Sequence, residues 1–494
     1  MLTLFFALSL LVATGLHAQA PPSAETHFQR VMANPNLQVE GQITGEQFCW
    51  HAASGADDFV DAYLAWNDAA WLDRGAAYFD WLVSLMATAP DGYRGWIGPY
   101  IYDEQYWCDV HVGDAILINP MLRFAEVVLA NDELKEIHGQ RAQRYVQLAQ
   151  RELIEKWDQR GTWHDDGPQG SYRAWDHYLA PNDLSTWHHS TDPKAGLSLP
   201  FNKQMDMGIA ALRLYRITGQ ERYRQRAERV FRLFKSRLRL FDGGYVWNYW
   251  EPLGPWDIDR KERRIRHWIN VHPTRNYQAR EVAFVAEAYH TGLVFTRTDI
   301  ERIIHTNLEN MWNGDGDQPR WRNAGLGGEW APQKKKRAGT LWSALVDFDE
   351  RARQLQAQRL RVGSIDHAYF HNVVATGPPS FARRYAATGP QEKSAALEST
   401  PNLVMAAALP RVSNGDTAAL LLCKTARDDA LQITLHATDA TSIDTLYDGR
   451  IKGGDDGLEG IFWISWDAAG VSPGTYSVRW RLGDEVRDCA IERR

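Results

Sequence analysis

The stretch that decides the fold is "KQMDMGIAALRLYRI–TGQ–ERYRQRAERVFRLFKSRL", residues 203–238. In both halves apolar residues recur three, four and seven positions apart, which places them on one face of an α-helix. The "TGQE" sequence between the halves is typical of a turn followed by a new helix start. The stretch therefore predicts two amphipathic helices joined by a short turn.

The same helix–turn–helix pattern occurs four times along the chain. Each copy is followed by a loop rich in aromatic residues, and the copies are residues 57–86, 115–157, 203–238 and 278–312. The spacing of roughly 65 to 85 residues is too long and irregular for a thin solenoid of small repeats. Together with the helical segments 341–360 and 366–387, the pattern predicts a mainly α chain, an (α/α) toroid or barrel over residues 21–395. An open helical array is the alternative.

From about Asn402 the helical periodicity of apolar residues gives way to a pattern typical of strands. The segments "AALLLCKTA", "LQITLHAT", "GIFWISWDAA" and "GTYSVRWRL" alternate apolar and polar residues between Gly, Asp and Pro turns. This pattern predicts a small C-terminal antiparallel β-sandwich over residues 396–494. A packing or spacer role is the expectation for it, with sugar binding as the alternative.

Residues 1–20, "MLTLFFALSLLVATGLHAQA", form an apolar run that ends in an A-x-A sequence. This is typical of a secretory signal peptide, although the run lacks an early Lys or Arg. It is short for a membrane span, so an uncleaved anchor is the less favoured alternative. We expect a secreted or periplasmic bacterial protein that does not remain in the membrane after signal cleavage.

The four cysteines fit an oxidising compartment. Cys49 and Cys108 lie in the N-terminal part, and Cys423 and Cys489 lie in the last hundred residues. One disulfide within each region is the simplest expectation, although four cysteines allow three pairings. No cysteine has a CxxC neighbour, so a metal site at the cysteines is not expected. No cofactor is expected either.

Charge and aromatic content indicate the class of ligand. The net charge of −7 argues against a nucleic-acid partner, so local basic patches would have to carry any anion binding. The chain holds 21 Trp, 19 Tyr and 17 Phe, many of them in loops beside Gly, Pro, Asp and Asn. Flat rings on a surface suit the apolar faces of sugar rings. Carbohydrate contact and core packing both remain open for these loop aromatics.

The polar segment "HWINVHPTRNY", residues 267–277, precedes the fourth hairpin and contains more polar groups than a helix needs. It should lie on the same side of the ring as the loop "GGYVWNYWEP" and the start of the third hairpin. Two sets of candidates follow. The catalytic candidates are Asn202, Glu251, His272, Arg275 and Tyr277. The substrate-binding candidates are Tyr106, Trp247, Tyr249, Trp250 and Arg266.

These residue types fit β-elimination at a uronic acid. The C5 proton beside a uronate carboxylate can be removed only if that carboxylate is neutralised, which Asn, His or Arg can do. A Tyr with a lowered pKa can accept the proton and pass one to the leaving glycosidic oxygen. Tyr277 could instead simply pack at the start of a helix, and His272 could be an interhelical hydrogen-bonding residue.

The motifs "FNKQMDMG", "GGYVWNYWEP" and "HPTRNY", set among helical hairpins, resemble the (α/α)-barrel polysaccharide lyases, most nearly polysaccharide lyase family 38. The likeness covers roughly residues 40 to 390 and leaves the β-rich tail unexplained. It implies a lyase acting on alginate or glucuronan, with Tyr277 as acid/base supported by His272, Arg275, Asn202 and Glu251. Arg266 competes with Arg275 for its role, and Tyr249 with Tyr277. The implied partner is an acidic polysaccharide, and the oligomeric state is left open.

Two other functions are compatible with the sequence. A glycoside hydrolase on the same toroid would need two carboxylates across a glycosidic bond. Its candidates are Asp103, Glu104, Asp109, Asp114, Asp165, Asp166 and Glu251. A non-catalytic glycan-binding protein is the second alternative. "DVHVGD" also allows a weak metal hypothesis at His111, whereas "GLGG" and "GGDDG" lack the spacing of a nucleotide-binding loop.

Overall fold

The computed structural model describes sixteen stretches of the chain. They are residues 21–39, 41, 43–101, 103–181, 183–192, 194–259, 264–265, 277–325, 327–330, 339–374, 403–410, 418–425, 428–453, 461–467, 471–472 and 474–493. The predicted signal peptide and the predicted domain boundary at 395/396 lie outside these residues, so both stay predictions. No helix among the described residues is both long and apolar enough to span a bilayer.

The predicted helical hairpins are present. In the first three, α3 (Asp58–Trp66) packs on α4 (Ala70–Ser84), α5 (His111–Leu129) on α6 (Asp132–Leu148), and α8 (Phe201–Thr218) on α9 (Glu221–Ser236). The fourth consists of α10 (Tyr277–His290) and α11 (Arg297–His305). The long helix predicted to reach Trp157 continues from α6 through a π-helical segment (Ala149–Glu155) into α7 (Lys156–Gln159).

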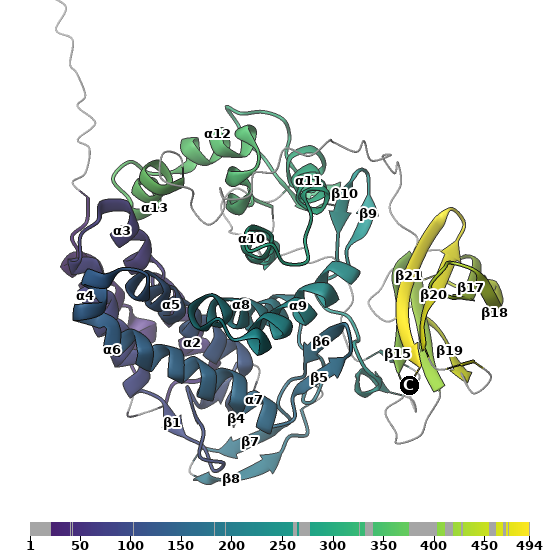
Figure 1. The fold of residues 1–494 in the computed structure, drawn as a ribbon, viewed down its shortest axis with the longest axis horizontal. Coiled ribbons are helices and arrows are strands. Elements are labelled where there is room, and N and C mark those ends of the chain that lie inside the picture. Colours follow the sequence, from purple (N-terminus) through teal and green to yellow (C-terminus); the bar gives the residue numbers. More distant parts are fainter. Residues whose placement is uncertain are drawn as a thin grey trace, which may run out of the picture.

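The hairpins are arranged around a ring (Figure 1). Helix α5 contacts α3 and α8, and α8 contacts α10. Helix α13 (Ile365–Tyr369) returns to pack on α3. In the π-helical segment that follows it (Phe370–Val374), Asn372 Nδ2 donates to the carbonyl of Ala65 at 2.9 Å. A short helix, α12 (Glu350–Arg359), lies beside α13 on the far side of the ring from α5 and α8. Because α13 contacts the first hairpin, the closed (α/α) arrangement fits better than an open array.

Two kinds of element were not predicted from the sequence. Helices α1 (Ala24–Met32) and α2 (Gly45–Ala53) precede the first predicted hairpin. The predicted aromatic loops also contain short strands. One sheet joins β3 (Gly98–Tyr100), β4 (Asp103–Cys108), β7 (His177–Ala180) and β8 (Asp183–His189) in that order. The other loop strands form two-stranded ribbons: β1 (Ala87–Thr88) with β2 (Arg94–Gly95), β5 (Trp163–Asp166) with β6 (Gln169–Tyr172), β9 (Arg239–Phe241) with β10 (Gly244–Val246), β11 (Ile258–Asp259) with β12 (Arg264–Ile265), and β13 (Arg322–Ala324) with β14 (Gly327–Trp330).

The C-terminal region is an antiparallel β-sandwich, as predicted. One sheet consists of β15 (Leu403–Pro410), β16 (Ala418–Thr425) and β19 (Ile461–Asp467). The other has the order β18 (Ser442–Ile451), β17 (Asp429–His436), β20 (Gly474–Leu482) and β21 (Glu485–Arg493). Side chains from both sheets share one core that includes Leu421, Ile433 and Trp480. Arg487 links the sandwich to the helical domain by donating to the carbonyls of Ser236 and Leu238.

The expected disulfides are not present, because all four cysteines are free thiols. Cys49 is buried on α2, where its sulfur lies 3.1 Å from the position that a Cβ on Gly113 would take. Cys489 donates from Sγ to the carbonyl of Ala406 at 3.4 Å. The sulfur atoms are used for packing and a weak hydrogen bond, and the prediction of one disulfide in each region is wrong for this structure.

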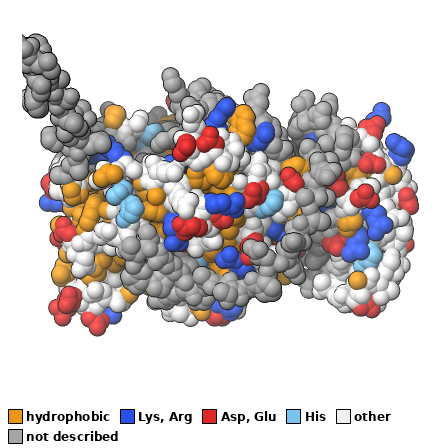
Figure 2. Space-filling view, turned by 90° about the horizontal axis from the view of Figure 1, so that it is seen from above, with side chains coloured by type: hydrophobic (Ala, Val, Ile, Leu, Met, Phe, Trp, Pro, Cys, Tyr) orange, Lys and Arg blue, Asp and Glu red, His pale blue; other side chains and the backbone are white. Residues whose placement is uncertain are grey.

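Acidic and basic side chains are mixed on the face shown in Figure 2, with no large field of one sign among the described residues there. This agrees with a modest net charge of −7. Attraction of an acidic polymer would therefore depend on a few local cations rather than on the whole surface.

Buried charges join the inner helices at their C-terminal halves. Glu287 of α10 accepts from Arg213 Nη2 at 2.9 Å and from Arg216 Nη2 at 2.7 Å, both on α8. Arg216 also forms a two-pronged pair with Glu126 of α5, at 2.5 and 2.7 Å. Burial opposes ionisation, but the two guanidinium groups hold the pKa of Glu287 well below its usual range. This ion network fixes three neighbouring helices in register.

We expect Glu287→Gln to destabilise the protein by about 3–5 kcal/mol, because it leaves two buried guanidinium groups short of their counter-charge. The lowered pKa means that Glu287 stabilises the fold above its unfolded pKa, and this contribution is lost as the pH falls through the folded value. Urea unfolding at neutral pH measures the change. The control is Glu221→Gln in an exposed pair with Arg224, for which we expect about 1 kcal/mol or less. An equal loss of unfolding free energy in both variants would contradict a structural role for the network.

Candidate active site

A cavity of about 570 Å³ lies where α2, α5 and α8 begin, against the sheet that contains β4 and β7. Its wall carries charged, aromatic and imidazole side chains: Glu46, Tyr100, Tyr106, Cys108, Asp109, His111, Trp175, His177, Asp192, Lys194 and Lys203.

A glycine contact brings α2 to this cavity. Gly45, the first residue of α2, has φ +79°, and a Cβ there would lie 2.7 Å from the carbonyl oxygen of Pro99. Gly98 on β3 is equally tight, with its own Cβ position 2.6 Å from the Gly45 nitrogen. Only glycine permits this conformation and approach. The contact sets the start of α2 against the sheet and turns Glu46 towards the cavity.

Glu46 is buried, at 3% exposure, but only one of its carboxylate oxygens has a described partner. Oε1 accepts from Lys203 Nζ at 3.0 Å and from Trp50 Nε1 at 3.4 Å. Oε2 has no hydrogen-bond partner among the described residues. A buried carboxylate oxygen normally has a partner, so Oε2 is available to a bound molecule.

The charges of three carboxylates act on the Cys108 thiol. Burial raises its pKa to about 12, and the charges of Glu46, Asp109 and Asp192 add to the effect. All three carboxylates line the same cavity. They come from α2, from the residue after β4 and from the segment after β8, so three different elements bring negative charge to one place.

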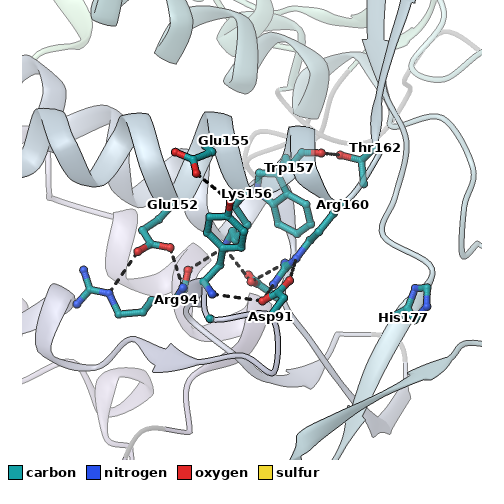
Figure 3. Close-up of polar contacts among 12 residues, drawn as sticks. Asp91, Arg94, Glu152, Glu155, Lys156, Trp157, Arg160, Thr162 and His177 are labelled. Atoms are coloured by element: carbon teal, nitrogen blue, oxygen red, sulfur yellow. Dashed lines mark hydrogen bonds and ion pairs between the residues drawn. The ribbon is translucent and has the colours of Figure 1, made fainter.

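Two buried cations, Lys156 and Arg160, compensate the negative charge of Asp109 (Figure 3). Lys156 Nζ lies 2.8 Å from both Asp109 Oδ2 and Asp114 Oδ2, and it donates to the carbonyl of Arg94 at 2.9 Å. Arg160 pairs with Asp109 at 2.8 Å. Although burial opposes ionisation, these two cations hold the pKa of Asp109 below its ordinary value.

The same network rules out the metal hypothesis for "DVHVGD". The Lys156 ammonium pairs with both Asp109 and Asp114. His111 is buried, stacks on Trp157 at 3.7 Å and hydrogen-bonds Thr162 at 2.9 Å. Burial lowers the pKa of His111 well below its usual range. Asp114, in the first turn of α5, accepts from Trp157 Nε1 through Oδ2 at 2.9 Å.

A row of aromatic rings continues from the cavity. Trp50, which contacts Glu46, lies 6.3 Å from Tyr277, and Tyr277 stacks on Tyr249 at 5.6 Å with 18° between the ring planes. The Phe201 nitrogen donates to the carbonyl of Tyr249 at 3.1 Å, which ties the start of α8 to this row. The structure thus brings Tyr249 and Tyr277 together, and Asn202 follows Phe201 at the start of α8. A functional role for these three residues stays a prediction.

Helices α8 and α10 carry buried polar atoms without hydrogen-bond partners among the described residues. Both side-chain atoms of Asn202, one oxygen of Asp206, one of Gln278 and one of Glu281 have no hydrogen-bond partner among the described residues. Glu281 Oε2 accepts from Trp247 Nε1 at 2.6 Å. Burial raises the pKa of Glu281 from 4.5 to about 8, with a smaller contribution from the Asp206 charge. This is an unusually polar interior for the first turns of two packed helices.

The remaining predicted residues are placed differently. Trp247 is 1% exposed and supports Glu281, so its predicted role as a substrate platform is wrong. Trp250 is half-buried and donates from Nε1 to the carbonyl of Ser198 at 2.6 Å. Glu251 accepts from Asn248 at 2.7 Å and lies 3.8 Å from Arg237. Tyr106 lines the cavity, away from the Tyr249–Tyr277 stack, with its hydroxyl 3.2 Å from Thr191. His272, Arg275 and Arg266 lie outside the described residues.

Most of the carboxylates that the sequence offered for hydrolysis do not line the cavity. Asp103 and Glu104 lie on the half-buried to exposed β4 edge, Asp165 pairs with Arg229 at 2.5 Å, and Asp166 is exposed. Glu46, Asp192 and Lys203 were not predicted from the sequence. Glu46 and Trp50 are four residues apart in "TGEQFCWHAA", a helical spacing that would have placed both side chains on one face.

No protein-family model matches this sequence, and no curated protein sequence matches it. Several solved structures are similar at low identity. An α-mannanase of glycoside hydrolase family 76 from Bacteroides thetaiotaomicron is 12% identical, covers 68% of each chain and has a TM-score of 0.38. An inactive variant of the family 76 α-1,6-mannanase of Salegentibacter sp., in complex with α-1,6-mannotetrose, is 16% identical over 71% of this chain and 84% of that chain, with a TM-score of 0.38.

Cellobiose 2-epimerase from Bacillus thermoamylovorans is 11% identical over 60% of this chain and 72% of that chain, with a TM-score of 0.34. None of these three structures is a polysaccharide lyase. With TM-scores below 0.5, the likenesses assign neither a family nor a reaction to this chain.

We expect Glu281 to make stability depend on pH between about 4.5 and 8. Because its folded pKa is raised, its contribution is fully present below the unfolded pKa and is lost as the pH rises towards the folded value, by about 1.4 kcal/mol for each pH step of one. Glu281→Gln keeps an oxygen for Trp247 and removes the ionisation. Urea unfolding at several pH values should show that the free energy of unfolding of the variant increases relative to that of the natural protein as the pH rises. A constant difference would mean that Glu281 does not titrate in this range.

Proposed function

We propose that this chain is a glycan-cleaving enzyme and that its substrate lies in the cavity and along the Trp50–Tyr277–Tyr249 row. The observation that carries the proposal is a single cavity whose wall holds three carboxylates, Glu46, Asp109 and Asp192, among aromatic side chains. Aromatic faces bind the apolar faces of sugars, and carboxylates bind hydroxyl groups and transfer protons. The lining of the cavity, rather than likeness to other structures, supports this proposal.

The reaction that this lining fits best is glycoside hydrolysis. Most glycosidases use two carboxyl groups, one that protonates the leaving oxygen and one that acts as base or nucleophile. We assign these roles to Glu46 and Asp192, which reach the cavity from α2 and from the segment after β8. Asp109 is the third carboxylate, but Lys156 and Arg160 both bind it, so its part is to set the local charge.

A second candidate reaction is β-elimination at a uronate, with Tyr277 as acid/base. It is favoured by the position of Tyr277 in the aromatic row next to the start of α8, where Asn202 has an amide group without described partners. Such an amide could neutralise a substrate carboxylate. The support from His272 and Arg275 that the resemblance to family 38 lyases implies lies outside the described residues.

The two reactions differ in their products. With purified protein and a panel of alginate, glucuronan, glycosaminoglycans, mannans and glucans, hydrolysis releases reducing ends without ultraviolet absorbance. Elimination produces an unsaturated uronate that absorbs. We expect reducing ends alone, and we expect Glu46→Gln to lower the rate by about 100-fold or more.

The matched control is Glu136→Gln on the exposed face of α6, which should leave the rate unchanged. A Glu46→Gln variant with full activity would remove Glu46 from the reaction. If glycans bind but none is shortened, the non-catalytic binding function takes the place of both reactions.

Tyr277→Phe tests the second candidate. If elimination occurs with Tyr277 as acid/base, the variant should lose about 100-fold or more of the absorbance-forming rate. If the reaction is hydrolysis, we expect Tyr277→Phe to weaken substrate binding only slightly, because the aromatic ring remains in the row. Tyr215→Phe on α8, which is half-buried, is the control for loss of a hydroxyl group. Full retention of a measured elimination rate would exclude Tyr277 as the base.

A further inference from the structure

Three metal-ligating side chains meet where β7 and β8 pair, at the edge of the cavity. One ligand atom from each of Asp176, His177 and His189 lies within 4.8 Å of the other two. Asp176 Oδ1 is 2.7 Å from His177 Nδ1, and the His177 and His189 rings are 4.0 Å apart. The carboxylates of the proposed reaction, Glu46 and Asp192, are not part of this cluster.

The strand pairing builds the cluster. His177 lies directly opposite His189 in the β7–β8 register, so the two side chains project from neighbouring strands on the same side. The segment after β8 is tied back by the Ser190 nitrogen, which donates to the carbonyl of Asp176 at 2.8 Å. These backbone contacts hold all three side chains in one place without help from a ligand.

One imidazole is fixed and another is adjustable. The Trp175 indole stacks on His177 at 4.4 Å with 24° between the planes. His177 is largely covered, with 22% of its side chain exposed, and it lines the cavity. His189 is exposed and Asp176 is half-buried, so both can turn towards an ion. A fixed ring with mobile partners lets the ligand atoms close around a cation.

We propose that Asp176, His177 and His189 bind a divalent first-row transition metal, with Zn²⁺ as the probe. Two imidazoles and a carboxylate form a ligand set that favours such ions over Ca²⁺ or Mg²⁺, which prefer oxygen ligands. Tetrahedral Zn²⁺ with bonds of about 2.1 Å needs ligand atoms roughly 3.4 Å apart, so a small rotation of the exposed His189 completes the site.

Three protein ligands leave the fourth position of the ion for a water molecule or a substrate oxygen. Because His177 lines the cavity, this position lies at the cavity edge. Metal binding depends only on the three side chains, so it can hold or fail independently of the proposed glycan cleavage. It would replace the expectation, drawn from the sequence, that the chain binds no metal.

The test is calorimetric titration of Zn²⁺ into the tag-free full chain, with the metal content confirmed after gel filtration. We expect one bound equivalent, and affinity lower by at least about 10-fold in Asp176→Asn, His177→Gln and His189→Gln. The control is His188→Gln, one residue away on β8, whose ring lies 5.5 Å from Tyr178. It should bind Zn²⁺ like the natural protein.

His367 and His371 could also bind Zn²⁺, because their imidazole rings lie 4.4 Å apart near α13. The His371→Gln variant tests this competing location. Circular dichroism without metal shows whether each variant is folded, and the single-site variants are compared only when their spectra agree. No Zn²⁺ binding by the natural protein, unchanged affinity in the three ligand variants, or loss of binding only in His371→Gln would each overturn the proposal.

Discussion

The arrangement of the helical domain depends on the buried ion network between its inner helices. Glu287 and Glu126 hold Arg213 and Arg216, so that α5, α8 and α10 are joined by paired charges as well as by apolar packing. A buried charge without its partner costs several kcal/mol, so the helices cannot slide without breaking these pairs. The register fixed at their C-terminal halves also fixes where their N-terminal ends meet, and the cavity lies at the start of α5 and α8.

Charge at the cavity is organised in layers. Glu46, Asp109 and Asp192 line the wall, while Lys156 and Arg160 pair with Asp109 and hold it in its ionised form. Fixed buried cations allow carboxylates to gather in one place without all of them taking up protons. Such carboxylates are already oriented before a substrate arrives, which is the condition for efficient electrostatic catalysis.

The sequence predicted the elements with strong periodicity and failed where tertiary contacts decide. The hairpin at 203–238 became α8 and α9 with ends within two residues, because its apolar spacing and the "TGQ" turn are local signals. The C-terminal strands were predicted for the same reason. The loop strands were missed, because an aromatic segment such as "YDEQYWCD" forms a strand only where β3 and β7 pair with it.

The site shows the same division. Tyr249 and Tyr277, which border the third and fourth hairpins, stack on each other, and their role in a site stays a prediction. Glu46 was missed because the approach of Gly45 to Pro99, which turns it towards the cavity, joins segments far apart in sequence. Trp247 was taken for a surface platform, but its indole is buried against Glu281. Burial of that kind depends on which face of a loop meets a helix, and a single sequence does not determine it.

The central claim is that a carboxylate pair in the cavity cleaves a glycan with water. Cleavage in heavy-oxygen water, followed by mass spectrometry of the fragments, tests it most directly. Hydrolysis predicts that each new reducing end carries one heavy oxygen from the solvent. Fragments that lack solvent oxygen and are lighter by one water molecule would contradict the account and establish elimination instead.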